Sequence, residues 1–343
     1  MAKEKLHHIL EAQQFSRQWL EEEFFPELDY ISKLFEPDPV FKSMPVLGSP
    51  AYSTFLKNKS VCVLFYEPSS RTRISFGQAA GLMGAHVEST SEAKKFSSAA
   101  KGESLKDFIR TVSDYHFDAV VLRSDYVGGA HEAAKVSGTV PIINAGDGPG
   151  QHPTQALLDV ATIRKFIGTL DGLNVTLVGD LKNGRTVRSL AYLLSKFHGN
   201  HLSLVAPQSF QMKPDILEKL SGRVSFSQHS NLLEIAQNSD VIYMTRLQTE
   251  RIPYMKKLPL GWQFVLAKRF LHAKDVSISE AVMEKVRDDA IIMHPLPRSE
   301  GFDELPERFT DDPRVRAFRK TGQPGQTGMG LYTRMALLKI LLW

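Results

Sequence analysis

The sequence is poor in cysteine, with Cys62 alone among 343 residues. A single cysteine excludes an internal disulfide and any metal cluster built on several thiolates. Because Cys62 lies inside the apolar run VCVLFY, we interpret it as a buried core thiol and not as a nucleophile. We expect neither a metal site nor a cofactor.

Long hydrophobic runs are also absent, since no apolar stretch reaches the roughly 20 residues needed to span a bilayer. The first residues, MAKEKLHHILEAQQ, are charged and lack the apolar core of a signal peptide. We therefore expect a cytoplasmic protein that does not bind membranes. Neither charge sign dominates, because 42 Lys and Arg face 38 Asp and Glu, an excess of +4. A small positive charge is compatible with binding anionic small molecules and with binding nucleic acid, so it does not distinguish these two classes of ligand.

Short apolar runs rich in Val and Ile alternate with longer helical patterns from about residue 60 to 295. Their nearly continuous hydrophobicity is typical of strands that are covered on both faces. The expected strands are 61–66, 118–123, 140–146, 174–180, 201–207, 240–246 and 290–295. Strands that alternate with helices predict parallel sheets with right-handed crossovers.

Two helical patterns between these runs have clear ends. In SLKDFIRTVSDYH, an amphipathic helix presents five residues on one face, and Ser104 with Asp107 forms a capping box (Leu105, Phe108, Ile109, Val112 and Tyr115). TQALLDVATIRKFIG follows a proline and stops at Gly168. We place a domain boundary there, which predicts an α/β fold of two doubly wound parallel-sheet domains, 1–167 plus 317–343 and 168–316.

Two segments have little regular pattern. Residues 36–60 hold four prolines and predict a long irregular connection. The loop KTGQPGQTGMG, 320–330, precedes an apolar helix, LYTRMALLKILLW. We expect that helix to pack on the body of the protein and not on a membrane.

The stretch FYEPSSRTRISF, residues 65–76, places hydroxyl groups and arginines where a strand turns into a helix. The free N–H groups at the start of a helix and its dipole favour an anion. Ser69, Ser70 and Thr72 add hydroxyl donors, and Arg71 adds a planar fork that suits phosphate oxygens. The alternative is an ordinary Ser/Thr cap with surface arginines.

Several other expected strands also end in polar residues. Those that follow the strands include Arg123, His152, Gln155, Lys182, Arg185, Arg246, Gln248, Arg251 and Arg298. Because ligands of open parallel sheets bind beyond the carboxyl ends of the strands, we expect these side chains to converge on one cleft between the domains. His152 stays open as a general base, a neutral donor or a satisfied core residue, and its place between a Gly turn and a Pro favours the donor.

These motifs together resemble the aspartate carbamoyltransferases, which belong to the aspartate/ornithine carbamoyltransferase superfamily and make N-carbamoyl-aspartate for pyrimidine synthesis. The resemblance rests on FYEPSSRTRISF, KGESL, VVLR, NAGDGPGQHPTQALLD, VGDLKNGRTVRSL, YMTRLQTER and MHPLPR, which follow in order over most of residues 60–300. HILEAQQF and LYTRMALL add weaker likeness. The implied substrates are carbamoyl phosphate and L-aspartate.

The resemblance also implies the roles of individual residues. It assigns the phosphate to Ser69, Ser70, Arg71 and Thr72, with Arg123 beside them. It assigns the carbonyl oxygen to Thr72, Arg123 and His152, and the carbamoyl NH2 to Gln155 and the main-chain carbonyls of Pro295 and Leu296. The carboxylates of aspartate fall to Arg185, Arg246 and Gln248, where an arginine can grip a carboxylate with two hydrogen bonds.

Ser97 and Lys101, in FSSAAKGES, match a loop that the family lends to the neighbouring subunit, with Lys101 as a second anion contact. The resemblance therefore implies a homotrimer with shared active sites, and a larger assembly with regulatory or synthetase partners stays open. In isolation, this segment is a loop of small residues. The chain departs from the family pattern at Pro68, Ser70 and Ala100 and in the longer tracts 36–60 and 299–327.

Two alternatives compete with this interpretation. A carbamoyltransferase for ornithine would need an acidic partner for the side-chain ammonium and, by resemblance, a cysteine in place of HPLPR, and neither is seen. A non-catalytic anion sensor or nucleic-acid binder is the other. The arginines follow strands singly and are not interleaved with aromatic residues, which disfavours nucleic acid.

Overall fold

A computed structural model describes residues 6–35, 54–91, 93, 102–246, 248, 257, 259, 262, 275–298, 304–320 and 323–343. The chain divides into two compact units, Met1–Leu157 with Gly328–Trp343, and Leu158–Thr327. It passes between them inside helices α7 (Pro153–Ile167) and α12 (Gln326–Leu342). The functional domains expected at 1–167 plus 317–343 and at 168–316 stay a prediction.

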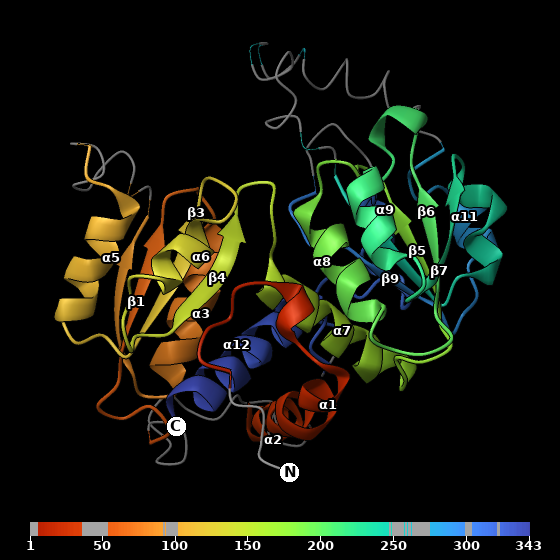
Figure 1. The fold of residues 1–343 in the computed structure, drawn as a ribbon. Helices are drawn as coiled ribbons and strands as arrows, with labels where there is room; N and C mark the ends of the chain where they lie inside the picture. Colours follow the sequence, from red (N-terminus) through yellow and green to blue (C-terminus); the bar gives the residue numbers. More distant parts are fainter. Residues whose placement is uncertain are drawn as a thin grey trace. The chain divides into compact units, whose positions relative to one another are not determined.

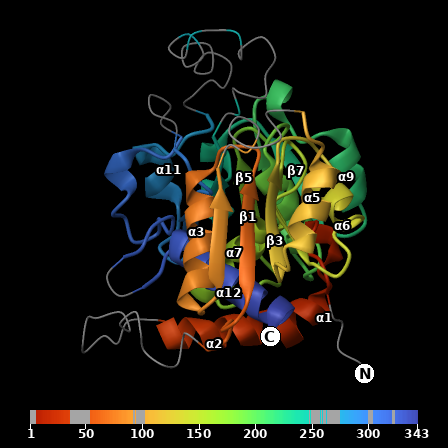
Figure 2. The same cartoon turned by 90° about the vertical axis from the view of Figure 1, so that its left-hand side faces the viewer.

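The first unit contains a four-stranded parallel sheet in the order β2-β1-β3-β4. Its strands are β1 (Ser60–Phe65), β2 (His86–Thr90), β3 (Ala119–Ser124) and β4 (Ile142–Asp147). The connecting helices are α3 (Ser70–Leu82), α5 (Leu105–Asp114) and α6 (Gly129–Ala134). Figure 2 shows α3 on one side of β1 and β3 and α5 on the other. Every residue of β3 and β4 is buried, as expected for strands covered on both faces.

A helical layer from both chain ends completes this unit (Figure 1). Its elements are η1 (Ala12–Gln14), α1 (Arg17–Trp19), η2 (Leu20–Phe24), α2 (Phe25–Phe35) and the part of α12 from Gly328 onward. Helix α12 is tied to α2 by Lys339, whose Nζ lies 2.8 Å from both carboxylate oxygens of Glu27. The apolar C-terminal helix therefore packs on the body of the protein, as predicted.

The second unit contains a five-stranded parallel sheet in the order β7-β6-β5-β8-β9. Its strands are β5 (Asn174–Val178), β6 (His201–Val205), β7 (Ser225–His229), β8 (Val241–Met244) and β9 (Ile291–Met293). Its helices are α8 (Arg185–Leu194), α9 (Pro214–Leu220) and α11 (Glu280–Lys285), with short turns η4 (Gln208–Phe210), η5 (Leu232–Glu234), η6 (Ala236–Asn238) and η8 (Glu307–Phe309). Figure 1 shows α8 and α9 on one face of this sheet and α11 on the other.

All seven predicted strands and the class of two parallel-sheet α/β domains are confirmed. Two further strands, β2 and β7, were missed because each is an edge strand with few apolar residues. The capping residue Ser104 is confirmed, and it accepts from Asp107 N, but Tyr115 lies beyond the helix and is 68% exposed. The last helix begins at Gln326, inside the segment predicted as a loop. Residues 36–53 of the predicted connection lie outside the described residues.

Among the helices of the described ranges, none combines the length and the apolarity that crossing a membrane requires.

Candidate functional site

Each sheet has a point at which the order of its strands reverses. In the first unit this switch point lies between β1 and β3, and in the second between β5 and β8. Connections on either side of a switch point run to opposite faces of the sheet, which opens a crevice at the carboxyl ends of the strands. The predicted site residues that follow these four strands therefore stand where such folds bind ligands.

The residues after β1 form the start of helix α3. Ser69 is the N-cap residue, and its hydroxyl donates to Thr72 Oγ1 at 3.2 Å instead of accepting from a main-chain N–H. Ser70 and Arg71 occupy the first turn and are exposed, whereas Thr72 is buried. The 13-residue helix thus presents its positive end, hydroxyl groups and a guanidinium to the same place.

Arg123, near the end of β3, is held in a fixed position beside that helix start. Its Nη1 donates to the carbonyl of Ala145 at 2.9 Å, and its Nη2 lies 3.2 Å from Oε2 of Glu67, which precedes the serine turn. The guanidinium is buried, and these two contacts offset the free-energy cost of removing its charge from water. Glu67 is not among the residues predicted from the sequence, although it directly follows the predicted strand 61–66.

The loop between β4 and α7 carries His152, and the first turn of α7 carries Gln155; both residues are buried. The carbonyl of His152 accepts from the N–H groups of Gln155 and Ala156, so His152 stands at the start of α7. Thr154 Oγ1 lies 3.4 Å from its Nδ1. The imidazole therefore lies next to the first turn of α7, and its role stays a prediction.

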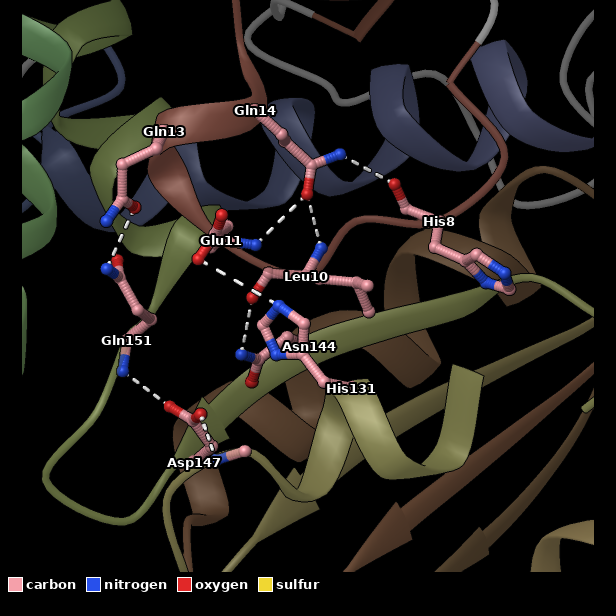
Figure 3. Close-up of polar contacts among 10 residues, drawn as sticks. His8, Leu10, Glu11, Gln13, Gln14, His131, Asn144, Asp147 and Gln151 are labelled. Carbon is pink, nitrogen blue, oxygen red and sulfur yellow. Dashed lines mark hydrogen bonds and ion pairs between the residues drawn. The ribbon is translucent and has the colours of Figure 1, made fainter. Parts of the chain in front are cut away.

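Asp147 and the N-terminal segment hold this loop from two sides (Figure 3). Asp147 accepts from the N–H groups of Gln151 and Gly128. Gln151 Nε2 donates to Gln13 Oε1 at 2.9 Å, and Asn144 Nδ2 donates to the carbonyl of Leu10 at 2.7 Å. The segment before α1 thereby fixes the residue next to His152.

At the second switch point, β5 and β8 approach each other closely. Thr245 donates from both N and Oγ1 to the carbonyl of Val178, each at 2.8 Å. Gly179 follows with φ +112, and a Cβ there would lie 2.3 Å from the carbonyl oxygen of Thr245. Glycine is therefore required by both the conformation and the space.

Asp180 connects the two loops that leave this switch point. The carboxylate is fully buried and accepts from Asn183 N at 3.0 Å and from Gln248 N at 3.1 Å. Asn183 lies two residues before Arg185, so this carboxylate fixes both the loop after β5 and the main chain at Gln248, four residues beyond β8. Its role was not predicted, although it is the last residue of the predicted strand 174–180.

Arg185 is the first residue of helix α8 and is buried. A cation at the positive end of a helix is electrostatically unfavourable, and an anionic ligand between them would relieve this repulsion. Arg246 is half-buried after β8, and Gln248 Nε2 donates to its carbonyl at 3.4 Å. The structure thus brings two arginines and an amide to the carboxyl ends of β5 and β8.

The turn after β9 contains Pro295 and Leu296, which are half-buried. Leu296 has φ +58, and its N–H donates to Nδ1 of His294 at 2.9 Å. Arg298 is engaged elsewhere, because it donates to Thr310 Oγ1 at 2.7 Å and contacts Glu307. Ser97 and Lys101 lie outside the described residues.

Cys62 is half-buried in β1, where burial and the charge of Glu88 raise the pKa of its thiol to about 11. The thiol is therefore protonated at neutral pH and is no nucleophile. Among the residues that the structure describes, no group of three or more His, Cys, Asp or Glu could hold a metal ion. The chemistry available at the two switch points is the binding of anions by hydroxyls, N–H groups and guanidinium forks.

Family comparison assigns both halves of the chain. Residues 7–165 match the model of the carbamoyl-P binding domain of aspartate/ornithine carbamoyltransferase, and residues 171–341 match the Asp/Orn binding domain of the same family. Among curated proteins, aspartate carbamoyltransferase 1 (chloroplastic) from Pisum sativum is 45% identical over 340 residues, which are 98% of this chain and 79% of that protein.

Solved structures agree with this family. Aspartate transcarbamoylase from Trypanosoma cruzi in complex with N-(phosphonacetyl)-L-aspartic acid has a TM-score of 0.82 at 36% identity, covering 100% of this chain and 98% of that one. The same enzyme with carbamoyl phosphate and aspartate has a TM-score of 0.81 at 35% identity, covering 99% and 98%.

Proposed function

The chain belongs to the aspartate/ornithine carbamoyltransferase family, and we infer that it transfers the carbamoyl group of carbamoyl phosphate to the α-amine of L-aspartate. In this reaction the neutral amine attacks the carbonyl carbon, a C–N bond forms and the C–O bond to phosphate breaks. The proton released by the amine leaves with the phosphate. The products are N-carbamoyl-L-aspartate and inorganic phosphate.

One observation carries the assignment to this chain's own residues. The hydroxyl and cationic groups of the sequence motifs occur at the switch point of each sheet, after β1 and β3 in one unit and after β5 and β8 in the other. Switch points are where open α/β sheets bind ligands. Two anion-binding switch points in one chain suit a reaction between two anionic substrates.

At the β1–β3 switch point, the start of α3 would bind the phosphate through Ser69, Ser70, Arg71 and Thr72. Arg123 would contact both the phosphate and the carbonyl oxygen. Its position is fixed by Glu67 and by the carbonyl of Ala145, so little reorganisation would accompany the reaction. Donors fixed in advance at an oxygen that gains negative charge are the expected main source of rate.

His152 would act as a further donor to that oxygen and not as a general base. Its place at the start of α7, with Thr154 close to Nδ1, supports a role as a fixed hydrogen-bond donor. Phosphate is already a competent leaving group and can accept the proton of the amine. Gln155 and the carbonyls of Pro295 and Leu296 would accept from the carbamoyl NH2.

At the β5–β8 switch point, Arg185, Arg246 and Gln248 would bind the two carboxylates of aspartate. The position of Arg185 at the start of α8 supports an anionic ligand, and Asp180 keeps its loop beside Gln248. Ornithine carries a side-chain ammonium in place of the second carboxylate, which two arginines would repel.

Assembly and location are further proposals. The likeness of FSSAAKGES to the loop that the family shares between subunits supports a homotrimer in which Ser97 and Lys101 reach a neighbour's site. We also propose a cytoplasmic location. The size of the purified chain in solution tests the first, and a tagged chain observed in cells tests the second.

The function is tested by incubating the purified protein with carbamoyl phosphate and L-aspartate and assaying N-carbamoyl-L-aspartate. We expect product with L-aspartate and none above background with L-ornithine. Turnover with ornithine alone would reverse the assignment of the acceptor, and no turnover with either would favour a non-catalytic anion-binding protein.

A further inference from the structure

A buried histidine stands directly before the turn that carries the Pro295 and Leu296 carbonyls. His294 is 1% exposed and lies just beyond the end of β9. Its Nδ1 is 2.9 Å from the N–H of Leu296, and its Nε2 is 3.2 Å from Oε1 of Glu304, a residue that is also 1% exposed. Neither residue belongs to the set predicted from the sequence.

The hydrogen bonds fix the tautomer of this ring. A main-chain N–H can only donate, so Nδ1 of His294 accepts and carries no proton. The ring hydrogen of the neutral imidazole is then on Nε2, from which it donates to the carboxylate of Glu304. Glu304 thereby selects the tautomer that can hold Leu296.

The main chain of His294 is anchored separately. Its N–H donates to Oε1 of Gln326 at 2.9 Å, and Nε2 of Gln326 donates to Oδ1 of Asp159 at 2.7 Å. The other oxygen of Asp159 accepts from the hydroxyl of Tyr243 in β8 at 2.7 Å. All of these groups are buried, so α12, α7 and β8 hold the main chain of the histidine in one place within the second unit.

Leu296 needs such support, because its φ of +58 is unfavourable for a residue with a Cβ atom. Conformations of this kind persist only where the surroundings determine them. The hydrogen bond from Leu296 N to His294 Nδ1 is the contact that holds the peptide in this orientation.

We propose that His294 is a positioning residue, which through Leu296 aims the Pro295 and Leu296 carbonyls at the NH2 of carbamoyl phosphate, with Glu304 setting its tautomer. This inference rests on the proposed function. It makes the His294–Glu304 pair one determinant of selectivity for a carbamoyl over another acyl group, beside Gln155.

The test uses acetyl phosphate, which keeps the phosphate and replaces the amine with a methyl group. The quantity measured is the ratio of its Kd to that of carbamoyl phosphate, obtained by calorimetry on the full chain. Two variants separate the hydrogen bond at Nδ1 of His294 from the hydrogen bond at its Nε2. In His294→Asn the amide oxygen stands near the place of Nδ1 and can still accept from Leu296, whereas in His294→Gln the amide reaches the place of Nε2 and leaves Leu296 unheld.

We expect His294→Gln to lower the preference for carbamoyl phosphate about tenfold or more, through weaker binding of carbamoyl phosphate alone. His294→Asn should keep the ratio within roughly threefold of the wild type. The matched control is His201→Gln, since His201 bonds through both ring nitrogens to Ser225 and Ser227 far along the sheet from β9. It should leave the ratio unchanged.

Equal losses in both His294 variants, or an unchanged ratio in both, would overturn the positioning role. So would a wild-type chain that binds the two acyl phosphates equally. A wild-type chain that prefers carbamoyl phosphate yet makes no N-carbamoyl-L-aspartate would instead contradict the proposed function and leave the positioning role standing. Thermal unfolding of each variant identifies any that fails to fold, and the Asn and Gln variants then decide by comparison with each other.

Discussion

The two switch points present different kinds of groups. At β1–β3 the donors are short hydroxyls, the start of a helix and the guanidiniums of Arg71 and Arg123, and Arg123 is held by Glu67 and the Ala145 carbonyl. At β5–β8 the donors are long guanidinium and amide side chains, whose loops are tied together through the main chain by Asp180.

This difference suggests a division of labour. Donors that are fixed in advance suit an oxygen whose charge changes during the reaction, because reorganising them would lower the rate. Long forks suit carboxylates, whose charge is constant and whose spacing must be recognised. Changes at β1–β3 should therefore lower kcat, and changes at β5–β8 should raise KM for aspartate.

The largest effect is expected at Arg123. Arg123→Ala removes a donor from the reacting oxygen, and we expect kcat to fall about 10²–10³-fold. Steady-state kinetics with saturating aspartate measure this. The control is Arg110→Ala, because Arg110 is an exposed residue of α5 that pairs with Asp107 at 2.7 Å. A loss in kcat no larger than that of the control would remove Arg123 from the chemistry.

A smaller effect is expected at Arg246. Arg246→Lys keeps the charge but loses the paired geometry, so KM for aspartate should rise about 10–100-fold while kcat changes little. Arg287→Lys is the matched control, since Arg287 pairs with Asp240 at the opposite end of β8. If kcat falls and KM stays constant, the division of labour is wrong.

The close approach of β5 and β8 predicts a loss of stability. Gly179→Ala places a Cβ 2.3 Å from the Thr245 carbonyl, whereas Gly222→Ala, at φ +73, meets nothing within 4 Å. Both substitutions carry the penalty of a positive φ. The additional loss of stability in Gly179→Ala therefore measures the cost of the close contact between β5 and β8. We expect an excess of about 1–3 kcal/mol in the free energy of unfolding by urea. Equal losses would show that the strands can separate without cost.

The smallest effect concerns pH and the N-terminal segment. His8 Nδ1 accepts from Ile142 N at 3.0 Å, and burial, with the neighbouring His7, lowers the pKa of His8 from 6.5 to about 4. As pH falls, His8 is therefore protonated in the unfolded chain before it is protonated in the folded chain. The stabilisation that neutral His8 gives to the fold is lost as pH falls from 6.5 towards 4.

Because the ring is only partly buried, we expect a contribution of about 1 kcal/mol. His8→Asn retains an acceptor that does not titrate, and urea unfolding across this pH window should give a shallower pH dependence than the wild type. An identical slope would exclude His8 as its source.

The central strands could be predicted from the sequence because burial on both faces leaves a continuous apolar run, as in β3 and β4. Edge strands β2 and β7 carry no such signal, since HVEST and SFSQH are largely polar and partly exposed. Pairing with β1 or β6, and not composition, makes these segments strands.

The candidate site shows a similar division. Hydroxyl and cationic residues form recognisable motifs at strand ends, so Ser69, Arg123, His152 and Arg185 could be named as candidates. Glu67 and Asp180 were not named, because each depends on a partner distant in the sequence, Arg123 for Glu67 and Gln248 for Asp180. His294 lies within the motif MHPLPR, but its contacts with Leu296 and Glu304 are formed only by the folded chain. Spacing along the chain carries no information about these contacts.

The most direct test of the division of labour is calorimetric binding of carbamoyl phosphate without aspartate to the wild type, Arg123→Ala and Arg246→Ala. We predict that Arg123→Ala weakens binding about tenfold or more, while Arg246→Ala stays within roughly threefold of the wild type. If Arg246→Ala weakens the binding of carbamoyl phosphate as much as Arg123→Ala does, the account is contradicted.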